Sequence, residues 1–316
     1  MTERPLYAIL MQQLCVAGGT RMKVKNWAAA YAVLAAALYA VNIPLSKRLL
    51  EHIGPTMTAA LLYLGAGLGL LLYSLIGRAA GKTIIKERLT KTEFPYVLAM
   101  VLLDIAAPIL LMFGITRTSS ANVSLLNNFE IVATSVIAFF VFHEFLSKRL
   151  CIAIGLVTLA SMILGFEGVG SFRFNLGSLL VLCACVCWGF ENNCTKRISN
   201  KSSVEIVIIK GCFSGLGSLV VALILGEQVP ETVWFGCALL LGFASYGLSI
   251  HFYIMAQKDL GAAKTSAFYS IAPFLGVLFS MILLGERPAF QFYVALFMML
   301  LATVLLGRDT QATTEE

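Results

Sequence analysis

Apolar residues form ten long runs along this chain, and short polar segments separate them. A helix needs about 20 apolar residues to cross the hydrocarbon core of a bilayer, which is about 30 Å thick. The runs lack the polar stripe of a surface helix, and their length excludes a β-barrel. We therefore expect an all-α integral membrane protein with ten transmembrane helices. The predicted spans are 27–46, 55–77, 94–115, 120–142, 149–166, 175–195, 204–225, 232–255, 262–284 and 289–307.

The composition agrees with this expectation. Hydrophobic residues make up 59% of the chain and charged residues only 13%, whereas a soluble domain contains about 25% charged residues. An ordinary water-soluble domain is therefore excluded. The eight cysteines lie mostly within predicted helices and form no CxxC pair, so we interpret them as packing residues. We expect no metal site and no cofactor.

The distribution of the 23 Lys and Arg residues predicts the orientation. Most of them lie in the two tails and in the loops after even-numbered spans, and the positive-inside rule places such segments in the cytoplasm. We predict a multi-pass protein of the cell membrane with cytoplasmic tails at residues 1–26 and 308–316. Lys47 lies in an external loop and counts against this orientation. Residues 1–21 are either a tail or an over-extended reading frame, because Met22 also resembles a natural start.

Two halves of the sequence are similar to each other. YAVNIPLSKR (Tyr39–Arg48) aligns with WGFENNCTKR (Trp188–Arg197), and SANVS (Ser120–Ser124) aligns with AAKTS (Ala262–Ser266). This predicts two five-helix repeats, residues 27–166 and 175–307. Because five is an odd number, the second repeat enters the membrane from the opposite side. Inverted repeats of this kind are typical of secondary transporters, which bind their substrates at the interface between the halves.

The segment LGAAKTSAFYSIAPFLGVLFSMILLGERP (Leu260–Pro288) shows a known pattern. It has small residues at the helix start (Ala262 and Ala263), a proline within the helix (Pro273) and a terminal Glu286. In these features it resembles the repeat of the EamA family in the drug/metabolite transporter superfamily.

The resemblance covers residues 27–307, because the first half has the same arrangement of residues, which ends at Glu144. It implies a ten-helix carrier that exports small metabolites such as amino acids without hydrolysing ATP. One departure is Ile131, which occupies the position of the proline and follows Glu130.

Glu130 lies within an otherwise apolar run. About 10 residues of helix, at 1.5 Å each, separate it from the predicted helix start, which places it roughly 15 Å deep. A carboxylate at that depth costs about 2.5–3.5 kcal/mol, so it should face water or a partner. We interpret Glu130 as a substrate or proton site and include Asn127 in it. The alternative is a structural residue that Asn127 or Asn128 holds by hydrogen bonding.

Asp104 lies at a similar distance from the same hairpin turn, on the preceding helix. Two neighbouring carboxylates in a medium of low dielectric constant are not both ionised cheaply, so an Asp104–Glu130 pair could carry a proton during transport. Alternatively, Asp104 bonds a neighbour near Pro108.

Glu191 and Lys210 lie near the cytoplasmic ends of consecutive predicted helices. An ion pair between them would act either as a gate or as a structural clamp.

Three further residues are candidates for the binding site. Asn42 precedes Pro44, which removes a helix hydrogen bond, and broken helices often flank transporter binding sites. The alternative is a proline kink used for packing. Tyr246 and Tyr269 offer polar tips that either line a cavity or anchor a membrane interface.

These observations predict a secondary transporter, an exporter of a small metabolite such as an amino acid, that works by alternating access and is either proton-coupled or facilitative. The excess of acids over lysines within the spans favours a zwitterionic or cationic solute. The expected partners are this substrate and the lipid bilayer, without nucleic acid. The alternatives are a membrane channel and a membrane-embedded enzyme, but the chain has no HExxH, GxSxG or Walker motif.

Overall fold

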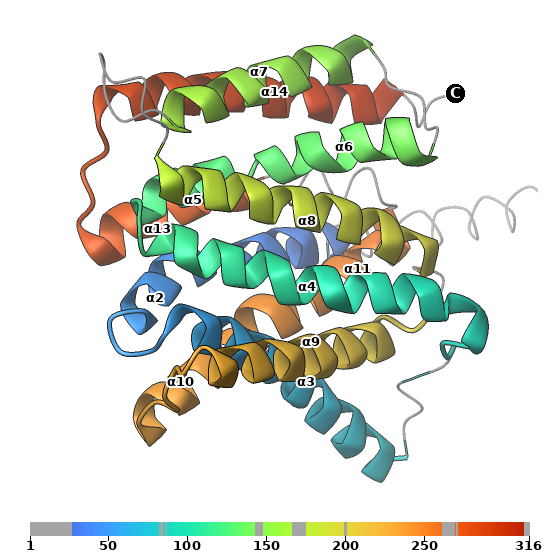
Figure 1. The fold of residues 1–316 in the computed structure, drawn as a ribbon. Coiled ribbons are helices and arrows are strands. Elements are labelled where there is room, and N and C mark those ends of the chain that lie inside the picture. Colours follow the sequence, from blue (N-terminus) through green and yellow to red (C-terminus); the bar gives the residue numbers. More distant parts are fainter. Residues whose placement is uncertain are drawn as a thin grey trace, which may run out of the picture.

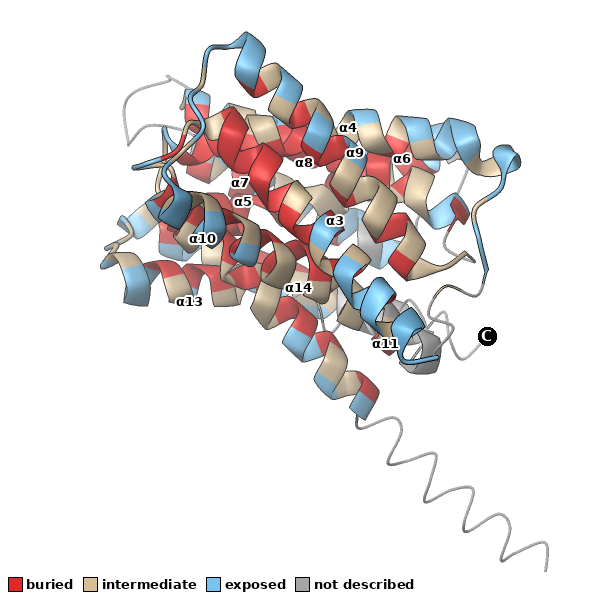
Figure 2. Cartoon of the chain, turned by 90° about the horizontal axis from the view of Figure 1, so that it is seen from below, coloured by how far each residue is buried: buried red, intermediate tan, exposed pale blue. Residues whose placement is uncertain are grey.

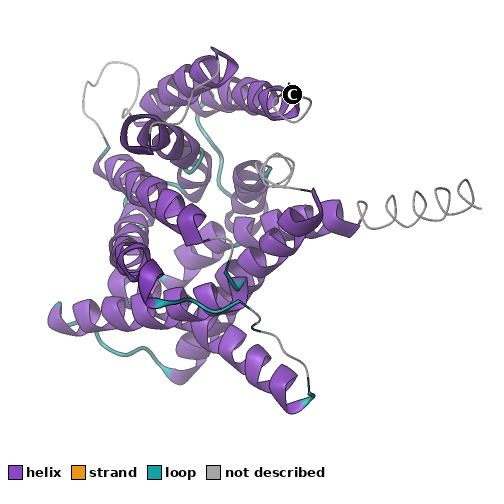
Figure 3. Cartoon of the chain, turned by 90° about the vertical axis from the view of Figure 1, so that its right-hand side faces the viewer, coloured by secondary structure: helices purple, strands orange, loops and turns teal. Residues whose placement is uncertain are grey.

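The computed structural model describes residues 27–81, 85, 87–142, 148–165, 175–198, 201–260, 269 and 271–312. The regular structure of these residues is helical throughout, and no strand occurs among them (Figure 3). The predicted tail at 1–26 and the last residues, 313–316, lie outside the described residues. The described part of the predicted tail at 308–316 is helical, because the last helix continues to Ala312.

The helices of the first half follow one another with short connections. Residues 27–40 are helical and precede α2 (Asn42–Leu49), α3 (Pro55–Ala79), the 3-10 turn η1 (Lys91–Glu93), α4 (Phe94–Ile115), α5 (Ser120–Leu126), α6 (Phe129–Phe142) and α7 (Lys148–Gly165). The second half contains α8 (Leu176–Ile198), α9 (Ser203–Ile224), α10 (Thr232–Gly242), the π-helical segment η2 (Phe243–Leu248), α11 (Ser249–Leu260), α13 (Ala272–Leu284) and α14 (Phe290–Ala312).

Among the described residues, seven helices are long and apolar enough to cross a membrane. Three shorter apolar helices, Cys151–Leu164, Ala272–Leu284 and Phe290–Leu305, occupy the positions of three further predicted spans. The chain is therefore an α-helical multi-pass membrane protein. The total of ten spans and the inverted repeat stay predictions.

Large apolar side chains cover the outside of the bundle. Phe140 is 70% exposed, Ile224 78% and Phe297 63%, which suits contact with lipid and not with water. Buried residues gather on the inward sides of the helices, with exposed residues on the outer sides and at the ends (Figure 2).

The bundle is built from helix pairs that combine the two halves. α3 packs along α9, α4 along α8 and α7 along α14. In Figure 1, α7 and α14 form one edge and α3, α9 and α10 the opposite one. Small residues allow the first of these contacts: a Cβ atom added to Gly211 would lie 2.3 Å from the backbone nitrogen of Gly67.

Several helices are interrupted within the predicted spans. The span predicted at 120–142 corresponds to the apolar helical stretch Ser120–Val141, but it is interrupted, because α5 ends at Leu126 and α6 begins at Phe129. The side-chain amide of Asn128 donates to the carbonyl oxygen of Leu125 at 3.1 Å, and such bonds compete with those of the helix. The backbone N–H of Glu130 then donates to the carbonyl oxygen of Asn127 at 3.1 Å. A bond between residues three apart is typical of a 3-10 turn, which is tighter than an α-helix.

Two more interruptions lie close to predicted site residues. The first helical segment turns at Val41, directly before Asn42, while Pro44 lies in the first turn of α2, where its missing N–H is tolerated. The span predicted at 232–255 contains η2, in which Ser245 Oγ donates to the carbonyl oxygen of Leu241 at 2.7 Å. π-Helical segments are rare and occur frequently at functional sites.

Candidate functional site

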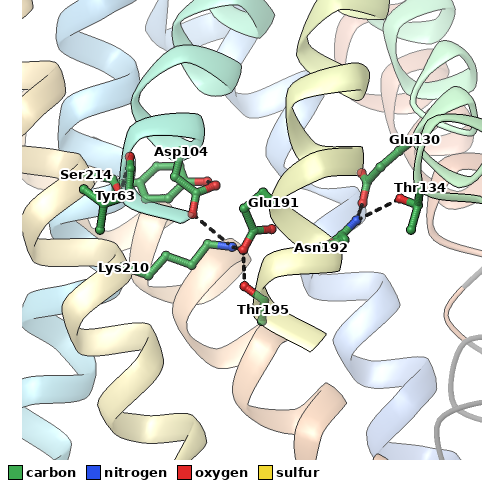
Figure 4. A network of polar contacts seen from close by, with 10 residues as sticks. Tyr63, Asp104, Glu130, Thr134, Glu191, Asn192, Thr195, Lys210 and Ser214 are labelled. Carbon is green, nitrogen blue, oxygen red and sulfur yellow. Dashed lines mark hydrogen bonds and ion pairs between the residues drawn. The ribbon is translucent and has the colours of Figure 1, made fainter. Parts of the chain in front are cut away.

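Three charged side chains meet inside the bundle (Figure 4). Lys210 Nζ on α9 lies 3.1 Å from Asp104 Oδ2 on α4 and 3.0 Å from Glu191 Oε1 on α8. Asp104 is 0% exposed and Glu191 only 2%. The predicted contact of Glu191 with Lys210 is thus present, and Asp104 joins it. We call these three residues the charge triad.

Two hydroxyl groups donate hydrogen bonds to the acids of the charge triad. Tyr63 on α3 donates to Asp104 Oδ1 at 2.9 Å, and Thr195 on α8 donates to Glu191. Buried ionised groups need such partners, because desolvation is costly. With every member ionised, two carboxylates share one ammonium group, and the net charge of the triad is negative.

Glu130 lies on the other side of α8. Its Oε1 accepts a bond from the side-chain amide of Asn192 at 2.7 Å, and the same amide lies 3.3 Å from Thr134 Oγ1. Consecutive helical residues point about 100° apart, so Glu191 and Asn192 reach towards different sides of α8 (Figure 4).

The structure therefore does not bring Asp104 and Glu130 together as a pair. Asn127 is buried, and its Oδ1 lies 4.0 Å from the thiol of Cys185. Asn128 bonds the backbone of Leu125. Among the described residues, the side-chain carboxylate of Glu130 bonds Asn192, and not Asn127 or Asn128.

Asn42 and Tyr246 meet across the two halves. The amide of Asn42 donates to the Tyr246 hydroxyl at 3.3 Å, and Ser46 Oγ donates to Asn42 Oδ1 at 3.1 Å. Both residues are buried. Asn42 directly follows the turn at Val41, and Tyr246 lies within the π-helical segment η2. The two interrupted segments thus bond each other.

Tyrosine rings connect these groups. The Tyr246 ring lies 5.1 Å from that of Tyr63 and 6.0 Å from that of Tyr39, whose ring is also 6.0 Å from that of Tyr269. The rings thus connect the charge triad, through Tyr63, to the Asn42–Tyr246 contact. We call Tyr39, Tyr63, Tyr246 and Tyr269 the tyrosine cluster.

Tyr39, Tyr63, Asn192 and Thr134 are not among the site residues predicted from the sequence. A tyrosine within an apolar run is more often an interface anchor than a hydrogen-bond donor to a buried acid. Asn192 had a local signal, since it follows Glu191 in the polar segment ENN. Within the described residues, no group of three or more His, Cys, Asp or Glu side chains is placed to hold a metal ion.

Comparison with known families gives one match over both halves. The sequence model of the EamA-like transporter family matches residues 26–166 and 175–308. Together the two matched segments cover most of the chain.

Curated relatives agree with this family. A protein of Methanothermobacter thermautotrophicus named "Uncharacterized transporter" is 25% identical, over 86% of this chain and 83% of its own length. "Uncharacterized transporter YyaM" of Bacillus subtilis is 21% identical, over 75% of this chain and 79% of its own length.

A solved crystal structure of a protein has a similar fold. Its TM-score is 0.66 at 14% sequence identity, and the match covers 90% of this chain and 97% of the other. At this identity the likeness concerns the fold alone.

Proposed function

The chain belongs to the EamA-like transporter family of the drug/metabolite transporter superfamily, and on this premise we propose that it is a secondary transporter that exports a small metabolite such as an amino acid. The two halves, residues 27–166 and 175–307, are inverted copies that rock about a central binding site. Both termini lie in the cytoplasm, and the protein resides in the cell membrane.

The packing of matching helices supports the inverted repeat. α3 and α9 are equivalent in the sequence alignment of the halves, as are α7 and α14, and each of these pairs is in extensive contact. α5 and α13, which belong to the equivalent spans 120–142 and 262–284, are also packed together. If a two-fold axis relates the halves, a helix that lies near this axis packs against the equivalent helix of the other half.

The helix interruptions support a binding site at this interface. α6 begins at Phe129 and α13 at Ala272, and these starts fall within one residue of each other in the sequence alignment of the halves. Discontinuous helices in transporters provide backbone groups for substrates and ions, and they provide points at which the helices bend.

The observation that carries the proposal is the position of Glu130. This half-buried carboxylate follows a helix break, and its Oε1 accepts a bond from Asn192. Within the part of the chain that the structure describes, no Lys, Arg or His forms an ion pair with Glu130. A carboxylate within a membrane that lacks a cationic partner either holds a proton or binds a cationic group. The Lys210 ammonium is held by the other two acids. We assign Glu130, Asp104, Asn42, Asn127, Tyr246 and Tyr269 to the substrate or proton site.

Glu191 and Lys210 act in this proposal as a gate pair. Both lie in the part of α8 and α9 that faces the cytoplasm in the proposed orientation. Opening on that side requires α8 and α9 to separate, which breaks the contact between the two side chains.

The test is a counterflow assay with the full chain in proteoliposomes. Vesicles loaded with one unlabelled amino acid or small amine are placed in a trace of the same compound in labelled form, with and without a pH gradient. A secondary transporter gives saturable, transient accumulation of label, and proton coupling makes it depend on the gradient. Flux that is linear in concentration, without counterflow, would indicate a channel and overturn the proposal.

A further inference from the structure

The N-terminus of α5 is capped by a carboxylate from the other half of the chain. Glu286, in the connection from α13 to α14, accepts the backbone N–H groups of Ser120 and Ala121, each at 2.8 Å. Ser119 Oγ accepts the next one, from Asn122, at 3.2 Å. The first amides of a helix have no partner within the helix, and a carboxylate also interacts favourably with the helix dipole. Glu286 therefore binds α5 by charge-assisted bonds.

α5 transmits this contact to the helix break. It has only seven residues, which span about 10 Å, and it ends directly before Asn127 and Asn128. Every residue of α5 except Asn122 is buried. A Cβ atom added to Gly276 of α13 would lie 2.9 Å from Ser124 Oγ, so the two helices are in close contact. A short helix in such tight packing moves as one piece.

A pocket adjoins the capped end of α5. It has a volume of about 380 Å³ and is lined by Asn122, Glu286 and Gln291 together with residues of α7 and α14. The start of α5 therefore has free space beside it, on the side of the carboxylate. α5 also contacts α2, α7 and α8, and Lys47 Nζ donates to the carbonyl oxygen of Thr118 at 3.0 Å. Glu286 is the acid that binds the first free amides of α5.

We propose that Glu286 is a positioning residue for transport. Its carboxylate holds the start of α5 against the α13–α14 connection, and through α5 it fixes the break at Asn127 and Asn128 and the position of Glu130. Movement of one half against the other then shifts α5 and Glu130 together with the segment that contains Glu286. The part of this inference that concerns transport rests on the proposed function.

The chain offers a matched control. Glu227 caps α3 in the same way, accepting the N–H groups of Thr56 at 3.1 Å and Met57 at 2.7 Å. α3 is an uninterrupted helix of 25 residues, so loss of its cap is expected to stay local.

The first experiment is hydrogen–deuterium exchange on the full chain in nanodiscs, which requires no substrate. In Glu286→Ala we expect exchange to rise roughly tenfold at Ser120 and Ala121 and to rise also beyond the break, at Glu130 and Ile131. In Glu227→Ala the rise should be confined to the start of α3. A rise in Glu286→Ala that ends before Asn127 would overturn the positioning role.

The second experiment compares counterflow kinetics in Glu286→Gln and Glu286→Ala. Gln keeps one acceptor oxygen, so it should retain folding and part of the activity. We expect the maximal rate to fall about tenfold in Glu286→Ala, with a smaller change in the substrate concentration at half-maximal rate. An unchanged maximal rate in a folded variant would overturn the inference. If the unaltered protein shows no counterflow, the proposed function fails, and the exchange result still decides the positioning role.

Discussion

The ammonium nitrogen of Lys210 lies 3.1 Å from Oδ2 of Asp104, a carboxylate that is completely buried between helices of both halves. This contact joins α4 to α9, and the second contact of Lys210, with Glu191, adds α8. One side chain thus connects three helices. Its removal has a different consequence from removal of either acid, because two acids compete for one cation.

We predict that Lys210→Met strongly destabilises the protein. The substitution leaves two buried carboxylates without a counter-charge, and breaking a buried ion pair costs about 3–5 kcal/mol. The apparent melting temperature of purified protein in detergent measures the effect. Glu191→Gln is the matched comparison, since it leaves a balanced Asp104–Lys210 pair and should cost about 1 kcal/mol. Equal melting temperatures for the two variants would contradict the charge balance described here.

Tyr63→Phe tests the hydroxyl that completes the charge triad. The ring, 5.1 Å from that of Tyr246, is retained, and the bond to Asp104 Oδ1 is lost. We expect a loss of about 1–3 kcal/mol, because a buried acceptor loses its partner. Tyr96→Phe, at a side chain that is 38% exposed, should leave the melting temperature unchanged. A similar response of both variants would show that the Tyr63 hydroxyl has no special role.

The sequence predicted the parts of this architecture that depend on local composition. The positions of the apolar runs follow from residue type alone, and each coincides with an apolar helix. The Glu191–Lys210 contact was predictable because the two residues lie on either side of the short connection between consecutive helices. The family resemblance identified the transporter class.

The side-chain partners could not be predicted, because they depend on how each helix is rotated about its axis. Asp104 and Glu130 lie at similar distances along the chain from the turn that joins their helices, yet Asp104 pairs with Lys210 and Glu130 bonds Asn192. The break between α5 and α6 depends on Asn128, whose amide bonds Leu125 O only when the side chain folds back on its own helix. Composition gives no indication of that choice, since Asn is also common on helix surfaces.

Glu130→Gln should preserve folding and abolish counterflow, or remove its dependence on a pH gradient. Gln keeps the shape and still accepts the bond from Asn192, which is 2.7 Å from Glu130 Oε1, but it can carry neither a proton nor a negative charge. Counterflow at several values of external pH is the measurement. Thr134→Val, which removes the more distant partner of Asn192 at 3.3 Å, should keep the pH dependence. Normal, pH-dependent counterflow by Glu130→Gln would remove this residue from the transport site.

Gly67→Ala tests the contact between α3 and α9. The added Cβ atom would lie 2.5 Å from the backbone nitrogen of Cys212, so the two helices must separate, and overpacking of this kind costs about 1–3 kcal/mol. Gly155→Ala in α7 is the control, because a Cβ atom there meets nothing within 4 Å and Ala favours a helix by about 1 kcal/mol over Gly. The melting temperature should therefore fall in Gly67→Ala and stay the same or rise in Gly155→Ala. Since α3 also contains Tyr63, which bonds Asp104, separation of the helices should reduce counterflow as well, and a fully active Gly67→Ala variant would show that the close approach is dispensable.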